Sequence, residues 1–180
     1  MRALISLLLF VVMIEAQSQQ SQTAIIHDIG YSFTLTAPTG WKYDMNAGRE
    51  LGLPVVFYPD TSKWTTSPVV MYANVTFLND SNQQNLEDVL RHDLDQFETR
   101  AYGEKVVRTK IKTLKTFTQG RKAELYEFIV KKNNNYETVA YIEEENVVVM
   151  IVVGSRKPEV YERFKPALEK LVLSYYWLGE

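Results

Sequence analysis

The stretch Asn146-Val-Val-Val-Met-Ile-Val-Val153 decides the fold of this chain. It contains seven apolar residues in succession, most of them β-branched, and Gly154 follows directly. β-branched residues favour strands, and a strand with one covered face would alternate apolar and polar residues. An unbroken apolar run is instead typical of a strand that is covered on both faces. The sequence therefore predicts an inner strand with layers of structure above and below it.

The residues on either side of this run predict a hairpin and a closing helix. Tyr136–Glu143 is a second strand-like stretch, and a short turn joins it to Val147–Val153. From Pro158 to Leu173, apolar residues recur at helical spacing and form one continuous stripe. Pro166 lies inside this segment and lacks a backbone donor, so we expect a kink or two abutting helices.

Earlier segments predict another helix and the remaining strands. Asn85 is a good N-cap, and apolar residues then recur at helical spacing. Pro68–Leu78 is largely apolar on both faces, which predicts a second inner strand. Asp44–Leu53 contains two glycines and both charge signs, so it is predicted to be a loop. Further strands are expected within Ala24–Asp28, Tyr31–Thr36, Pro54–Tyr58, Lys105–Thr118 and Ala123–Lys132.

Two amphipathic helices that flank consecutive, hairpin-connected strands predict an α+β fold. The simplest arrangement is a single antiparallel β-sheet with a helix packed on each face, an α/β/α sandwich. A β-sandwich or a barrel would leave the two helices without an obvious place to pack. No linker divides residues 24–180, so we expect one domain there.

The N-terminal residues predict export. Arg2 precedes the largely apolar run 3–14, and Ala16 suits cleavage by a signal peptidase. The run is shorter than the roughly 20 apolar residues that cross a bilayer. Residues 1–16 are therefore predicted to be a signal peptide and residues 17–23 a polar tether. The processed protein would be periplasmic or extracellular and would have no membrane span.

Composition and motifs exclude several classes of function. The net charge of −2 gives no general field for nucleic acid. The absence of cysteine excludes disulfides, thiolate catalysis and cysteine zinc sites. The sequence contains no P-loop, no G-x-G-x-x-G and no G-x-S-x-G. We therefore predict no cofactor and no enzymatic activity.

The two histidines and the acidic runs carry only weak signals. His92 lies near Asp88 and Asp95 on the polar face of the predicted helix, where such a cluster can hold a divalent cation weakly. A solvated acidic helix face has the same pattern, and we predict no metal site. Glu143-Glu-Glu145 falls in a predicted hairpin turn and is expected to be exposed.

Four residues are candidates for a partner surface. Arg108, Lys110 and Lys112 alternate on one face of a predicted strand, where they can dock an acidic protein surface or an anionic polymer. The alternative is that they protect an exposed sheet edge. Trp64 lies in a loop rich in hydroxyl residues, and aromatic residues are enriched at binding hot spots.

Several short motifs resemble the PsbP-like superfamily, and in particular its exported bacterial members. They are Gly30-Tyr-Ser-Phe33, Pro38-Thr-Gly-Trp41, Asn85-Leu-Glu-Asp88 and Tyr161-x-x-Phe164-x-Pro166-x-Leu168-x-x-Leu171. The resemblance covers nearly all of residues 24–180 and implies the α/β/α fold. It implies no functional site, because no metal or catalytic motif of the superfamily is matched.

Three functions remain in competition. The first is an exported, non-enzymatic accessory module that binds another protein or an envelope component, as the best-understood members of the superfamily do. The second is a small-ligand carrier or sensor with a pocket between sheet and helix, near Trp41 and Trp64. The third is a hydrolase that uses Asp or Glu with His92, which requires two titratable groups in one concave site.

Overall fold

The computed structural model of the chain describes residues 22–78, 83–101 and 106–179, and its main feature is a large antiparallel sheet. Seven strands pair in the order β3-β4-β5-β9-β8-β7-β6. They are β3 (Trp41–Asp44), β4 (Val55–Pro59), β5 (Val69–Phe77), β6 (Val107–Lys115), β7 (Lys122–Val130), β8 (Asn135–Glu143) and β9 (Val147–Ser155). The predicted α+β fold with a large antiparallel sheet is confirmed. The predicted signal peptide lies outside the described residues, as does most of the predicted tether.

A second, three-stranded sheet lies beside the large one. β1 (Thr23–Asp28) pairs with β2 (Tyr31–Thr36), and β2 pairs on its other side with β10 (Tyr176–Gly179). The prediction of a single sheet is therefore wrong. No local pattern marks β10, because this short strand is stabilised by pairing with residues from the opposite end of the chain.

The apolar run Val147–Val153 forms the middle strand of the large sheet, as predicted. β9 pairs with β8 on one side and with β5 on the other. No residue of the run is more than 5% exposed. Val147, Val149, Ile151 and Val153 contribute to one core cluster, whereas Val148, Met150 and Val152 contribute to another.

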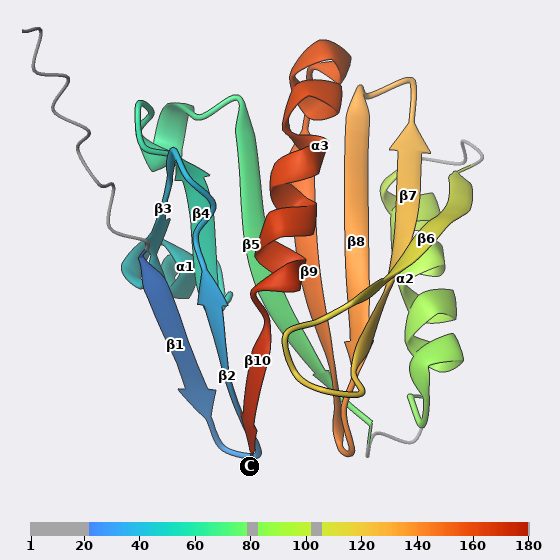
Figure 1. The fold of residues 1–180 in the computed structure, drawn as a ribbon. Helices are drawn as coiled ribbons and strands as arrows, with labels where there is room; N and C mark the ends of the chain where they lie inside the picture. The colour runs from blue at the N-terminus through green and yellow to red at the C-terminus, as the bar shows by residue number, and fades with distance from the viewer. Residues whose placement is uncertain (1–21, 79–82, 102–105, 180) are drawn as a thin grey trace, which may run out of the picture.

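The two long helices pack against these two clusters. α3 (Pro158–Leu173) contributes buried residues to the cluster that also includes the small sheet, whereas α2 (Leu86–Arg100) contributes to the other cluster. Figure 1 shows α3 in front of β9 and α2 behind the strands at the β6 end. α3 is one helix with Pro166 inside it, so the alternative of two abutting helices is wrong. Within the described residues, no helix is long and apolar enough to cross a membrane.

The segment predicted as a loop after β3 contains a short helix, α1 (Met45–Glu50). The Asp44 carboxylate caps it by accepting a hydrogen bond from the backbone of Ala47 at 2.9 Å. Gly48 lies so close to the following segment that a Cβ there would be 2.9 Å from the carbonyl oxygen of Leu53. Glycine at this position therefore permits close packing of the helix, and the loop prediction is wrong.

Candidate functional site

The basic side chains of β6 do not share one face of the sheet. The pairing with β7 shifts in register between Lys110 and Lys112, which makes the residue between them part of a β-bulge. Lys110 lies opposite Tyr126, which packs on the α2 side, whereas Lys112 lies opposite Leu125, which is buried on the α3 side. The predicted single stripe of Arg108, Lys110 and Lys112 is therefore wrong.

Each of these three cations also has a partner within the molecule. The distances are 2.8 Å from Lys110 Nζ to Glu124 Oε2, 2.5 Å from Lys112 Nζ to Glu169 Oε1 and 3.4 Å from Arg108 Nη1 to the Leu90 carbonyl oxygen. Their charges are partly compensated before any partner arrives. β6 is nevertheless an edge strand of the sheet. This position agrees with the alternative that its basic residues protect an exposed sheet edge.

Trp64 lies in a short 3₁₀ helix (Trp64–Thr66) and is half-buried. It packs on a small apolar cluster formed by Ala47, Val56 and Tyr58. This cluster is beside β4, near the end of the sheet opposite to β6. The four predicted partner residues are therefore not brought together into one surface.

The predicted acidic turn is not exposed throughout. Glu144 is 3% exposed, and its Oε2 lies 2.8 Å from Arg121 Nε. The Tyr175 hydroxyl donates a hydrogen bond to Glu144 Oε1 at 3.1 Å. Burial raises the pKa of the Glu144 carboxyl, and the Arg121 charge and the Tyr175 hydrogen bond oppose this shift. The expectation of an exposed Glu144 is wrong, because the turn folds back against the core.

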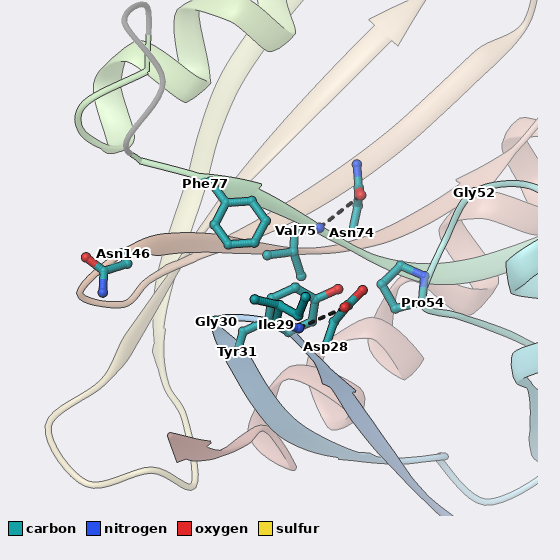
Figure 2. A pocket seen from close by; sticks show the side chains of 10 residues that line it. All are labelled: Asp28, Ile29, Gly30, Tyr31, Gly52, Pro54, Asn74, Val75, Phe77 and Asn146. Carbon is teal, nitrogen blue, oxygen red and sulfur yellow. Dashed lines mark hydrogen bonds between the residues drawn. The ribbon is translucent and has the colours of Figure 1, made fainter. Parts of the chain in front are cut away.

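A first cavity, of about 630 Å³, lies between the two sheets. Figure 2 shows the β1–β2 turn, with Ile29 and Tyr31, facing Val75 and Phe77 of β5 across this space. Ile29 is 90% exposed and Phe77 is 40% exposed. Among the described lining residues, Asp28 is the one carboxylate, and it accepts a hydrogen bond from the Ile29 backbone at 2.7 Å. This inter-sheet cavity combines apolar contact with the polar side chains of Asp28, Tyr31, Asn74 and Asn146, which are fewer than those of the cavity described next.

A second cavity, of about 420 Å³, lies between α2 and the large sheet, and is called the α2 cavity here. Three elements, α2, β5 and β8, supply most of its polar groups, and the segment before α2 adds Gln83. Its lining residues are Tyr72, Asn74, Thr76, Gln83, His92, Asp93, Gln96, Phe97, Arg100, Glu137, Val139, Met150 and Val152.

α2 carries several of these groups on an exposed flank at the rim of the cavity. His92, Gln96 and Arg100 follow one another at four-residue spacing and therefore lie along one stripe of the helix. Phe97 anchors the helix by stacking on Phe128 of β7 with 4.4 Å between ring centroids. The apolar packing of Phe97 therefore fixes where this polar stripe of α2 lies relative to the sheet.

Glu137 enters the cavity from β8, directly opposite Gly154 of β9. A Cβ at position 154 would lie 3.4 Å from Glu137 Cγ, so glycine leaves room for this side chain. Asn135 Nδ2 donates a hydrogen bond to Glu137 Oε1 at 2.7 Å, and both Asn135 and the nearby Tyr72 hydroxyl act to lower the pKa of this carboxyl. Burial nevertheless raises the pKa of Glu137, and the negative charge of Asp93 adds to the shift.

Asp93 is the second carboxylate of the cavity. The Tyr141 hydroxyl donates a hydrogen bond to Asp93 Oδ2 at 2.7 Å. Burial raises the pKa of Asp93, while this hydrogen bond and the charges of His92 and Arg100 oppose the rise. The α2 cavity thus holds two carboxylates that are partly removed from water and interact with each other.

Sequence reasoning did not identify this site. It placed His92 with Asp88 and Asp95, whereas the fold brings His92 to Asp93 and Glu137. One feature of the sequence could have indicated the cavity: Asn74 and Thr76 are polar residues on the α2 face of an inner strand. Within the described residues, no three potential metal ligands are grouped closely enough to hold an ion.

A pocket was expected between sheet and helix near Trp41 and Trp64. Trp41 is 6% exposed and contacts Phe164 of α3 edge-on, with 5.6 Å between ring centroids. Neither tryptophan lines the two cavities described above. A cavity between sheet and helix is present, but it lies beside α2 and is lined by other residues.

Comparisons with known proteins identify the fold. No protein-family model matches the sequence, and no curated protein does. The structure is similar to cyanobacterial PsbP (CyanoP) from Synechocystis sp. PCC 6803, with a TM-score of 0.54, 12% identity and coverage of 89% of this chain and 95% of that chain. It is also similar to the Ran-binding protein Mog1p of Saccharomyces cerevisiae, with a TM-score of 0.53, 14% identity and coverage of 88% and 97%. The chain has a Mog1/PsbP-like fold, and the expected resemblance is confirmed at this level.

Proposed function

We propose that this protein is a small-ligand carrier or sensor that binds its ligand in the α2 cavity. The observation that carries this proposal is the convergence of polar groups from α2, β5 and β8 on one space of about 420 Å³. Binding pockets for small molecules are typically about 300–1,000 Å³ and combine apolar walls with a few placed polar groups. Met150, Val152 and Phe97 supply such walls here.

The polar groups of the cavity are held in position before any ligand binds. Tyr141 fixes Asp93, and Asn135 fixes Glu137, through hydrogen bonds of 2.7 Å each. Preorganised groups lose little conformational freedom when a ligand binds, which favours affinity. This arrangement supports specific recognition of a ligand over a non-specific surface contact.

A second candidate is the accessory module that binds a protein or an envelope component. Ile29 and Phe77, the exposed apolar residues of the inter-sheet cavity, favour it. Mog1p, which shares the fold, is a Ran-binding protein. The basic residues of β6 support this candidate less, because they are already paired within the molecule.

The proposal also covers the compartment of the protein, its lack of a catalytic role and the arrangement of its helices and sheet in layers. The apolar run 3–14 supports an exported protein, periplasmic or extracellular. We propose no catalytic role, although His92, Asp93 and Glu137 share a cavity, as the hydrolase alternative requires. Packing of α2 and α3 against side chains that alternate along β9 supports an α/β/α sandwich.

A thermal-shift screen with a broad metabolite library tests the proposed function. A ligand at 100 times its dissociation constant adds about 2.7 kcal/mol of stability, which is a readily measured shift. We expect hits that Thr76→Val weakens, because Thr76 lines the α2 cavity and does not line the inter-sheet cavity. Asp28→Asn is the matched control, since Asp28 lines only the inter-sheet side. Hits that depend on Asp28 and not on the α2 cavity would contradict the proposal.

A further inference from the structure

We infer that the α2 cavity binds a small organic cation, a primary amine or a guanidinium, held between the carboxylates of Asp93 and Glu137. This inference rests on the ligand-binding function proposed above and names its chemical class. The observations that carry it are the cavity itself and the charges and hydrogen-bond partners of the groups that line it.

The described lining has more negative than positive charge. Asp93 and Glu137 are its two carboxylates and Arg100 is its one guanidinium, while the His92 side chain is exposed at the rim, where water screens any charge it carries. Arg100 is exposed in the last turn of α2, and within the described part of the chain it forms no ion pair with either carboxylate. A positively charged ligand would supply the missing counter-charge inside the cavity.

Both carboxylates keep capacity to accept further hydrogen bonds. The donors Asn135 and Tyr141 engage Glu137 Oε1 and Asp93 Oδ2. A carboxylate offers about four lone-pair sites, so each group can also accept from an ammonium or a guanidinium. These donors stabilise the ionised form that a cation requires.

The other walls suit a cation with an apolar stem. Tyr72 and Phe97 present aromatic side chains to the same space, and aromatic rings attract cations at short range. Met150 and Val152 cover the floor. Burial raises the pKa of both carboxyls although Arg100 opposes the rise, so a cation between them would favour their ionised forms. An anionic ligand would add repulsion, and a neutral one would leave the imbalance in place.

Isothermal titration calorimetry of the purified protein with three probes of similar length and one longer cation tests the inference. The probes are putrescine as the cation, 1,4-butanediol as the neutral analogue and succinate as the anion, and agmatine is a second cation. We expect the cations to bind at concentrations of about 1 mM or lower and the other probes not to bind. Asp93→Asn and Glu137→Gln should each weaken cation binding by roughly tenfold or more, because each removes a charged acceptor.

Matched controls separate the cavity from general surface charge. Asp95→Asn and Glu145→Gln remove exposed carboxylates outside the lining, and both should bind the cations like the wild type. If a cavity variant fails to fold, NMR of the wild-type protein still decides, because the side-chain amides of Gln83 and Gln96 line the α2 cavity and should shift on titration.

The outcomes distinguish this inference from the proposed function. Binding of succinate or butanediol in the α2 cavity, with no cation binding, overturns the cationic class and leaves the ligand-binding function standing. Failure of both cations to bind also overturns the inference, while hits in the metabolite screen that require Thr76 keep the proposed function. Cation binding that Asp95→Asn weakens as much as Asp93→Asn overturns the assigned location.

Discussion

The carboxylate of Glu144 lies 2.8 Å from the guanidinium Nε of Arg121. This pair joins the β8–β9 turn to the residue that precedes β7, and Tyr175 brings the end of α3 to the same carboxylate. Glu144 is buried, whereas the Arg121 side chain is 42% exposed. The contact therefore connects three segments that are distant in sequence around one carboxylate that has little access to water.

Loss of Arg121 should destabilise the fold. Arg121→Met keeps most of the aliphatic stem but removes the charge, which leaves the buried Glu144 carboxylate with only Tyr175 as a partner. We expect a loss of about 1–3 kcal/mol in the free energy of unfolding, measured by urea denaturation. Lys122→Met, at an exposed neighbouring position, is the control and should change stability by about 0.5 kcal/mol or less. Equal effects of the two substitutions would refute a specific role for the pair.

The raised pKa of Glu144 predicts the sign of a pH effect. Its folded-state pKa lies above the ordinary value of 4.5, so between the two values the folded state binds more protons than the unfolded state. The contribution of Glu144 to stability therefore decreases as pH rises through this window. Relative to Glu144→Gln, the wild type should lose stability as the pH rises above 4.5. Urea denaturation of both proteins at several pH values measures this difference, and a difference that grows in the opposite direction would show that the pKa is lowered.

Val149 should be essential for folding. It is fully buried in the middle strand, so Val149→Asp places a carboxylate in the core without a partner. The loss in the free energy of unfolding should be comparable to or larger than the roughly 5–15 kcal/mol that stabilises a typical domain. Cooperative unfolding should therefore be lost. Val107→Asp on the edge strand β6 is the control, because Val107 is 52% exposed. Circular dichroism and thermal melts distinguish them, and a Val149→Asp protein of wild-type stability would contradict the architecture.

The bulge in β6 predicts which charges interact. A double-mutant cycle between Lys112 and Glu169 should give a coupling of about 0.2–1 kcal/mol, as is usual for partly exposed ion pairs. The cycle between Lys112 and Glu124 is the control and should give no coupling, since Lys110 is the partner of Glu124. If Lys112 couples to Glu124 instead, the three cations share one face after all and the bulge is absent.

Gly154 should matter for the α2 cavity more than for stability. A Cβ in Gly154→Ala would approach Glu137 Cγ to 3.4 Å, and no positive φ makes alanine strained at this position. We expect a stability change of about 1 kcal/mol or less, together with weaker binding of the cationic probes. Calorimetry and thermal melts measure the two effects. Unchanged cation affinity would indicate that the position of Glu137 does not determine binding.

Much of the framework could be predicted because its signals are local. The run Val147–Val153 carries enough buried β-branched surface to require a covered strand, and Asn85 caps a helix whose apolar residues recur at the helical period. Pro158 similarly marks the start of α3. Such features depend on neighbouring residues, so one sequence is sufficient to read them.

The candidate site depended on contacts between distant residues. The sequence by itself determined the central strand, the two long helices and the α+β class, because backbone geometry and apolar periodicity act over a few residues. Only the tertiary structure decided that Ile111 takes part in a bulge, that Glu144 is buried and that Tyr72, Asp93 and Glu137 meet in one cavity. The physical reason is that register, burial of a charge and convergence of side chains follow from how the elements pack, and no local pattern records that packing.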